Sequence, residues 1–228
     1  SRGLGDVYKR QLPAISRWRA HLPDRQAPLY SVGYMASSHW GDEGNFQWQA
    51  LPNARFSIDG RYRRGRHRHP MFVLRNHATG EFMIGQLAWS GGYAFEFDLN
   101  ADPGGADESA RLTFRLGPDA PAPPRIIAPG ETVRTPEVHP GLTFGDLDTA
   151  IQAMHTHMRR SVILPQPRGM GGWIQAGIGP EIEITEESVY HAIENAARFG
   201  AEVFFIDASW YGAPRSNWWD TCGDWDVS

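Results

Sequence analysis

Between about residues 29 and 134, apolar and polar side chains alternate in short runs, which is the pattern of antiparallel strands. The alternation is clearest in Tyr93–Leu99, where every second residue is apolar or aromatic, as in a strand with one face on a core. Turn sequences such as Gly91-Gly92 and Gly117-Pro118 separate the runs. The predicted strands are Met71–Asn76, Glu81–Ser90, Tyr93–Leu99, Ala110–Leu116 and Arg125–Ala128. Short strands at this spacing predict a β-sandwich.

The pattern changes after residue 118. Ile126–Val133 is interpreted as the last strand of the sandwich, closing at Pro136. Beyond it a helix through Arg160 is predicted, because apolar residues recur there at helical spacing. These residues are Leu147, Ile151, Met154 and Met158. Asp146 can cap the start of this helix, which we interpret as a bridge between two domains.

The last part of the chain reads as strand, helix and strand. Gly172–Ala176 is the predicted first strand, and the helix is expected to begin after Thr185 and to end at Gly200. The second strand, Ala201–Asp207, is apolar enough to be buried on both faces of a parallel sheet. A full (β/α)8 barrel needs roughly 200 residues or more. The residues after Pro165 therefore make at most a quarter of one.

The candidate chemistry lies where this last strand ends. Asp207 would sit at the carboxyl end of its strand, the face at which α/β barrels bind substrate. Trp210 and Tyr211 follow it, and Asp224 and Trp225 continue the same loop. A carboxylate accepts hydrogen bonds from hydroxyl groups while aromatic rings cover apolar C–H faces, so the pattern favours sugar binding. The alternative is structural, with Asp207 capping the next loop and the rings packing against a helix.

The composition of the chain narrows the partners and ligands that can be expected. The 228 residues carry a net charge of -4, a hydrophobic fraction of 41% and 9 Trp, with no run long enough to span a membrane. Neither nucleic acid nor an anionic membrane is expected as a partner. Cys222 is the single cysteine, so no internal disulfide can form. The pairs His67/His69 and His155/His157 have no accompanying Cys or Asp cluster, and no metal ion is expected.

Residues 1–11 resemble the translated adapter read-through found at the edges of assembled sequencing reads. They show neither the apolar core of a signal peptide nor a helical pattern, so they are left out of the fold. The true N-terminus is then expected to be missing. The compartment stays unknown on this basis, with a soluble protein expected and the cytoplasm slightly favoured.

Several of these segments resemble glycoside hydrolase family 36, the bacterial and plant α-galactosidases. Phe204–Tyr211, followed by Gly223–Trp225, is similar to the family's second barrel strand and its Gly-Asp-Trp. Leu87–Tyr93 resembles a sandwich strand of the family, Pro129–Val138 its domain-closing segment and Gly145–Leu147 its connector. The resemblance covers roughly residues 70 to 225.

Two positions depart from the family pattern, whereas the segments that match it imply a domain layout. Ala208 stands where many members have a second Asp, and Ser209 where Gly is usual. The resemblance implies a supersandwich-like β-sandwich over 12–138, a linker helix over 139–164 and the incomplete start of a (β/α)8 TIM barrel over 165–228. The loss of the second Asp leaves the sugar specificity open.

The same resemblance implies a glycosidase that needs no cofactor. The intact enzyme would hydrolyse terminal α-linked galactosides, with an α-galactoside oligosaccharide as its substrate, and retain the anomeric configuration. Retention needs two carboxyl groups that flank the bond, and in this family they lie on later strands, beyond residue 228. No catalytic residue is therefore assigned, and the chain alone is expected to be inactive. Asp207, Trp210, Asp224 and Trp225 are the predicted substrate-binding residues.

Other functions stay open at this point. A related α-N-acetylgalactosaminidase or α-galactosyl transferase would share these segments, and a barrel enzyme of another glycosidase family would share the strands. A non-catalytic carbohydrate-binding β-sandwich module is the alternative from a different class. The sequence also leaves open whether the intact enzyme is a homo-oligomer.

Overall fold

The structure is a computed structural model, and it describes residues 8–36, 41–42, 44–60, 68–102, 108–119, 126–164, 173–179, 183–211 and 218–226. Of the positions used above, residues 1–7, His67, Arg125, Pro165 and Gly172 lie outside these ranges. The chain divides into two compact units, Ser1–Ile163 and Leu164–Ser228. We call them the sandwich unit and the βαβ unit and describe each by itself.

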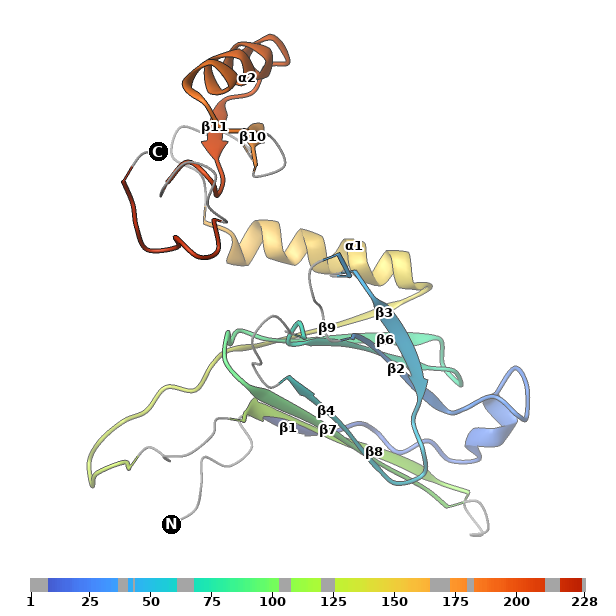
Figure 1. The fold of residues 1–228 in the computed structure, drawn as a ribbon. Helices are drawn as coiled ribbons and strands as arrows, with labels where there is room; N and C mark the ends of the chain where they lie inside the picture. The colour runs from blue at the N-terminus through green and yellow to red at the C-terminus, as the bar shows by residue number, and fades with distance from the viewer. Residues whose placement is uncertain are drawn as a thin grey trace. The chain divides into compact units, whose positions relative to one another are not determined.

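The sandwich unit consists of two antiparallel sheets that face each other across one core (Figure 1). The four-stranded sheet has the order β1 (Tyr8–Gln11), β8 (Ala110–Pro118), β7 (Tyr93–Ala101) and β4 (Arg55–Gly60). The five-stranded sheet has the order β3 (Phe46–Ala50), β2 (Tyr30–Met35), β5 (Met71–Asn76), β6 (Glu81–Leu87) and β9 (Val138–Phe144). A short 3-10 helix, η1 (Trp18–His21), lies between β1 and β2 in the chain.

The alternating runs form the strands that they predict. Met71–Asn76 is confirmed residue for residue as β5, and β6, β7 and β8 begin at the predicted Glu81, Tyr93 and Ala110. Along β7 every second side chain is buried, beginning with Tyr93. Alternation therefore identified the strands that have one face on the core.

The predicted last strand of the sandwich is wrong. No strand lies in the described residues 126–137, and Ile126 is 88% exposed. The sheet instead closes with β9, which pairs with β6 from Glu81↔Phe144 to Leu87↔Val138. The Pro140-Gly141 pair inside β9 has the sequence of a turn. It is tolerated in a strand because β9 is at the edge of its sheet, where a missing N–H need not break a ladder.

Part of the excluded segment 1–11 also belongs to the fold. Tyr8–Gln11 form β1 and pair antiparallel with β8, from Tyr8↔Leu116 to Gln11↔Thr113. The Tyr8 ring lies 6.0 Å from that of Phe114, a core residue. Strand pairing uses main-chain groups that every sequence except proline supplies, so a segment without an apolar pattern can still form an edge strand.

Phe72 is at the centre of the sandwich core. Its ring makes edge-on contacts with those of Phe95, Phe97 and Phe114, at centroid distances of 5.6, 5.0 and 5.8 Å. Gly85 is opposite Phe72 in the β5–β6 register, and a methyl group added at Gly85 would overlap the ring. Phe72 of the five-stranded sheet therefore packs against both β7 and β8 of the opposite sheet.

Helix α1 (Leu147–His157) covers the outer face of the five-stranded sheet. Asp146 is its N-cap, as predicted, and accepts a hydrogen bond of 2.8 Å from the Thr149 N–H. Ala150 is fully buried, and Ile151 and Met154 pack with it against the sheet. The helix continues as a π-helical turn, Met158–Val162, which includes the predicted end at Arg160.

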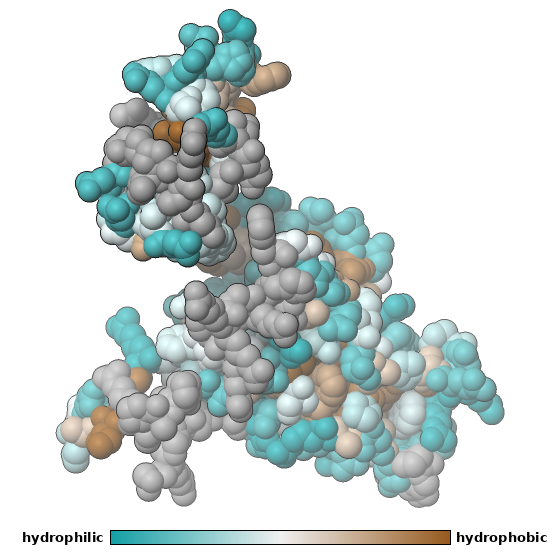
Figure 2. All heavy atoms as spheres, viewed as in Figure 1, coloured by the Kyte–Doolittle hydropathy of each residue, from teal (hydrophilic) through white to brown (hydrophobic). Residues whose placement is uncertain are grey.

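The βαβ unit contains two parallel strands, β10 (Gln175–Ile178) and β11 (Val203–Ile206), joined through α2 (Glu186–Arg198). Thr185 caps α2 in a capping box with Ser188, and Gly200 follows the helix with φ +81°, both as the sequence predicts. Polar side chains cover the visible outer side of α2 (Figure 2). No described helix is long and apolar enough to cross a membrane.

The predicted burial of the last strand on both faces is wrong for this chain. Phe205 is 48% exposed and Ile206 is 40% exposed. Within the described residues β11 has one neighbouring strand, β10, and contacts one helix, α2. A strand in a closed barrel would have neighbours on both sides, so one strand–helix–strand unit is what the fold shows, and the barrel stays a prediction.

Candidate functional site

Asp207 directly follows β11, at the carboxyl end of the parallel pair. Its N–H donates a hydrogen bond of 2.9 Å to the Ile178 carbonyl, so the backbone position is fixed by the neighbouring strand. One carboxylate oxygen, Oδ1, accepts a hydrogen bond of 2.8 Å from the Ala208 N–H. Asp207 therefore does cap the start of the following loop, as the structural alternative predicts. The side chain is nevertheless exposed, as a residue that contacts a ligand must be.

Three aromatic rings gather after this aspartate. Trp210 stacks on Trp225 with centroids 6.1 Å apart and planes 24° apart. Tyr211 meets both rings edge-on, at 5.1 Å from Trp210 and 4.9 Å from Trp225. We call these three residues the aromatic cluster. The structure therefore brings together two of the predicted substrate-binding residues, which are fifteen positions apart in the sequence.

Tyr211 is the buried member of the aromatic cluster, with 6% of its surface exposed, whereas Trp225 is 59% exposed. Burial raises the pKa of the Tyr211 hydroxyl, and the Cys222 thiol and the Asp207 carboxylate raise it further. Asp207 therefore lies within electrostatic reach of the aromatic cluster. Sequence analysis left Tyr211 out of the predicted binding residues. The only signal for it was its position next to Trp210.

Asp224 lies on a tight turn at the other end of this loop. Its N–H donates a hydrogen bond of 2.9 Å to the Thr221 carbonyl, and the preceding Gly223 has φ +111°. The side chain of Asp224 is exposed and takes no part in the ring contacts. The turn places Trp225 against Trp210. Asp224 is a candidate substrate-binding residue because it is next to Trp225 in the chain, and not because its side chain contacts the aromatic cluster.

Ser209 has a backbone conformation that side chains rarely adopt. Its φ is +78°, in the left-handed region where glycine carries no steric penalty. Glycine is usual at this position in the family 36 pattern that the segment resembles, and the observed conformation gives a physical reason for that preference. The strained residue lies between Asp207 and Trp210, so the backbone that positions both side chains passes through it.

Replacing Ser209 by glycine is expected to stabilise the βαβ unit by about 1 kcal/mol, because the left-handed strain is removed. Hydrogen exchange of the amides in β10 and β11, read by mass spectrometry, measures this change. Ala208→Gly is the matched control, since Ala208 has no positive φ. It should be neutral or slightly destabilising. Equal effects of the two substitutions would contradict the assignment of strain to Ser209.

The described residues hold no group of three or more His, Cys, Asp and Glu side chains that could bind a metal ion. The candidate site carries the carboxylates of Asp207 and Asp224 beside the aromatic cluster. Such a site can accept hydrogen bonds from hydroxyl groups and cover an apolar ring face. Its chemistry matches a neutral, hydroxylated ligand.

Neither a protein-family model nor a curated protein matches the sequence. Solved structures match its fold. An α-galactosidase from Lactobacillus brevis has a TM-score of 0.70 and 20% identity, covering 96% of this chain and 28% of that chain. The galactosidase domain of an α-galactosidase-sucrose kinase, AgaSK, has a TM-score of 0.67 and 21% identity, covering 88% and 28%. At these identities the likeness is one of fold, and this chain spans 28% of the length of either structure.

Proposed function

We propose that this chain is part of a glycoside hydrolase of family 36 that acts on terminal α-linked galactosides. The observation that carries the proposal is Asp207 at the carboxyl end of β11, followed by Trp210 stacked on Trp225. A fold shared with two α-galactosidase structures supports it. The sandwich unit is the N-terminal domain of such an enzyme, and the βαβ unit is the start of its barrel.

In this proposal Asp207 holds the sugar and does not attack it. Its exposed carboxylate accepts hydrogen bonds from sugar hydroxyl groups, which is the role of a charged acceptor in a polar site. Trp225, the more exposed ring of the stacked pair, covers the apolar face of the ring. Asp224 supplies a second acceptor from the neighbouring turn. The sugar would thus be fixed in position by groups on both sides of one loop.

Hydrolysis with retention needs two more carboxyl groups, about 5–5.5 Å apart, of which one attacks the anomeric carbon and the other protonates the leaving oxygen. We assign neither of them to this chain. The intact enzyme would supply both from later strands of the barrel. The chain alone is accordingly expected to bind an α-galactoside and not to hydrolyse it.

Replacing Asp207 by asparagine is expected to weaken binding of methyl α-galactoside about 10- to 100-fold, because a hydrogen bond to a charged group contributes about 1.5–3 kcal/mol. Titration of the tryptophan fluorescence of the whole chain measures the affinity. Asp148→Asn, in the first turn of α1, is the matched control. It should leave the affinity unchanged.

Two results would contradict the proposal. Equal affinities of the Asp207→Asn variant and the unmodified chain would remove Asp207 from the sugar site. Hydrolysis of p-nitrophenyl α-galactoside by this chain, abolished by Asp207→Ala, would show that a catalytic residue is present after all. Binding that survives Asp207→Asn and needs only the sandwich unit would instead identify a non-catalytic carbohydrate-binding module.

A further inference from the structure

A groove of about 90 Å³ opens in the sandwich unit where α1 lies on β6 and β9. Its lining includes Gln86 of β6, His139 of β9, and Met154 and His157 of α1. Liquid water occupies about 30 Å³ per molecule, so the groove has room for a small ion with part of its water shell. It contains none of the residues of the proposed sugar site.

Two imidazole rings meet in this groove. Nδ1 of His139 and Nε2 of His157 share a hydrogen bond of 3.0 Å, in which one ring donates its N–H to the other, and the ring centroids lie 5.1 Å apart. The two residues come from different elements, the edge strand β9 and the last position of α1. Both elements belong to the same packed unit, so the pair is held by the fold and not by one flexible segment. Neutral imidazole nitrogen is the commonest protein ligand of transition metals.

The separation of the two nitrogens selects among metal ions. At a metal–nitrogen distance of about 2.0–2.1 Å, a nitrogen separation of 3.0 Å corresponds to an angle of about 94° at the metal. Tetragonal and octahedral ions place neighbouring ligands about 90° apart, whereas tetrahedral Zn²⁺ prefers about 109°. An ion between the rings would take the place of the shared hydrogen, which moves to the other nitrogen of its ring. The angle of about 94° is nearer that of Cu²⁺ or Ni²⁺ than that of Zn²⁺.

Two further side chains lie near His139. The carboxylate of Glu137, which is 84% exposed, lies 3.8 Å from the other ring nitrogen, Nε2, too far for a hydrogen bond. Gln86 is the direct partner of His139 in the β6–β9 register and lines the same groove. The side chains of these two residues therefore lie on the same face of the sheet.

We propose that His139 and His157 form a binding site for one Cu²⁺ or Ni²⁺ ion, with Gln86 and water as the remaining ligands. The bound ion connects α1 to β9 and stabilises the sandwich unit, as any ligand of the folded state does. With two imidazole ligands the affinity is below that of sites with three or four protein ligands, and it falls at acid pH because protons compete for both rings.

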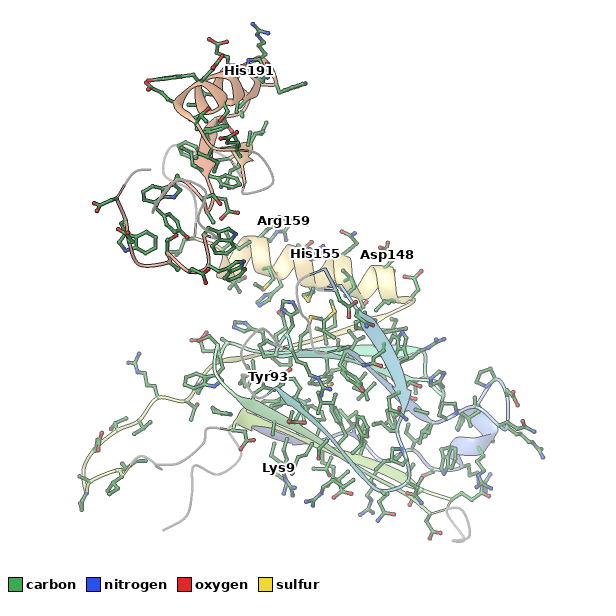
Figure 3. The ribbon with its side chains drawn as sticks, viewed as in Figure 1. Lys9, Tyr93, Asp148, His155, Arg159 and His191 are labelled. Atoms are coloured by element: carbon green, nitrogen blue, oxygen red, sulfur yellow. The ribbon has the colours of Figure 1, made fainter. Side chains whose placement is uncertain are left out.

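Isothermal titration of the whole chain, prepared without a polyhistidine tag, with NiCl2 tests the site. One ion per chain is expected, and His139→Gln and His157→Gln should each weaken binding at least tenfold. His155→Gln is the matched control, since His155 is exposed on the same helix (Figure 3) and does not line the groove. Absence of stoichiometric binding, or an equal loss in the His155→Gln variant, would overturn the proposal.

Electron paramagnetic resonance of the Cu²⁺ complex gives an independent readout that does not depend on the stability of the variants. Hyperfine splitting from two imidazole nitrogens is expected in the unmodified chain and from one nitrogen in either single variant. A spectrum that is unchanged by His157→Gln would overturn the assignment. Circular dichroism of each variant without metal confirms that the comparison is between folded proteins.

Discussion

Replacing Phe72 by alanine is expected to lower the free energy of unfolding of the sandwich unit by about 3–5 kcal/mol. The ring is fully buried and contacts three other aromatic rings, which belong to β7 and β8, the two central strands of the opposite sheet. Its removal leaves a cavity that rigid neighbours cannot fill. Urea denaturation followed by fluorescence and circular dichroism measures the loss.

Phe144→Ala is the matched control for this substitution. Phe144 belongs to β9 of the same unit, but 64% of its surface is exposed. Its removal should change the free energy of unfolding by no more than about 0.5 kcal/mol. Similar losses for the two variants would contradict a core centred on Phe72.

Raising the pH from 10 to 12 is expected to destabilise the sandwich unit. Burial, with a smaller contribution from the Glu81 carboxylate, raises the pKa of Tyr30 to about 12. Burial also raises the pKa of Tyr93, whose hydroxyl donates a hydrogen bond of 2.8 Å to the His69 carbonyl. Because these pKa values are higher in the folded state, the unfolded chain releases protons first. The contribution of these two tyrosines to stability is therefore complete below pH 10 and is lost as the pH rises through their pKa values in the folded state.

The expected loss from Tyr30 alone is about 3 kcal/mol, since each unit of pKa shift corresponds to about 1.4 kcal/mol. Urea denaturation at pH 8, 10, 11 and 12 measures it. Tyr30→Phe should flatten the decline, whereas Tyr190→Phe should not, because Tyr190 is largely exposed on α2. A free energy of unfolding that stays constant from pH 8 to 12 would contradict the assignment.

The strands that face the core can be predicted from the sequence, and the edges of the sheets cannot. In β7 the core imposes alternation, because every second side chain must be apolar. At the edge strand β9, Leu142 and Phe144 are exposed and Pro140 is tolerated. The packing constraint that produces a readable pattern is weak there, so the sequence pointed to a neighbouring segment instead.

For the candidate site, the residues can be predicted from the sequence but their contacts with one another cannot. Asp207 follows from the end of an apolar strand, and its two aromatic neighbours follow from their places beside it. The stacking of Trp210 on Trp225 depends on a turn with a left-handed glycine, Gly223, and such long-range contacts leave no periodic signal. The strain at Ser209 is likewise a property of the backbone. The one sign of this strain in the sequence is that a serine stands where glycine is usual in family 36.

Strand β1 also governs how the sandwich unit meets other molecules. Its exposed Lys9 (Figure 3) and Arg10 put two positive charges on the outermost strand of the four-stranded sheet. Charged edge strands discourage a second molecule from extending the sheet, whereas a long strand with an apolar face invites it. Without residues 8–11 the edge would be β8, nine residues long with alternate side chains buried. The segment with the least sequence pattern therefore places charged side chains along residues 113–116 of β8, where pairing with a second molecule is expected to be disfavoured.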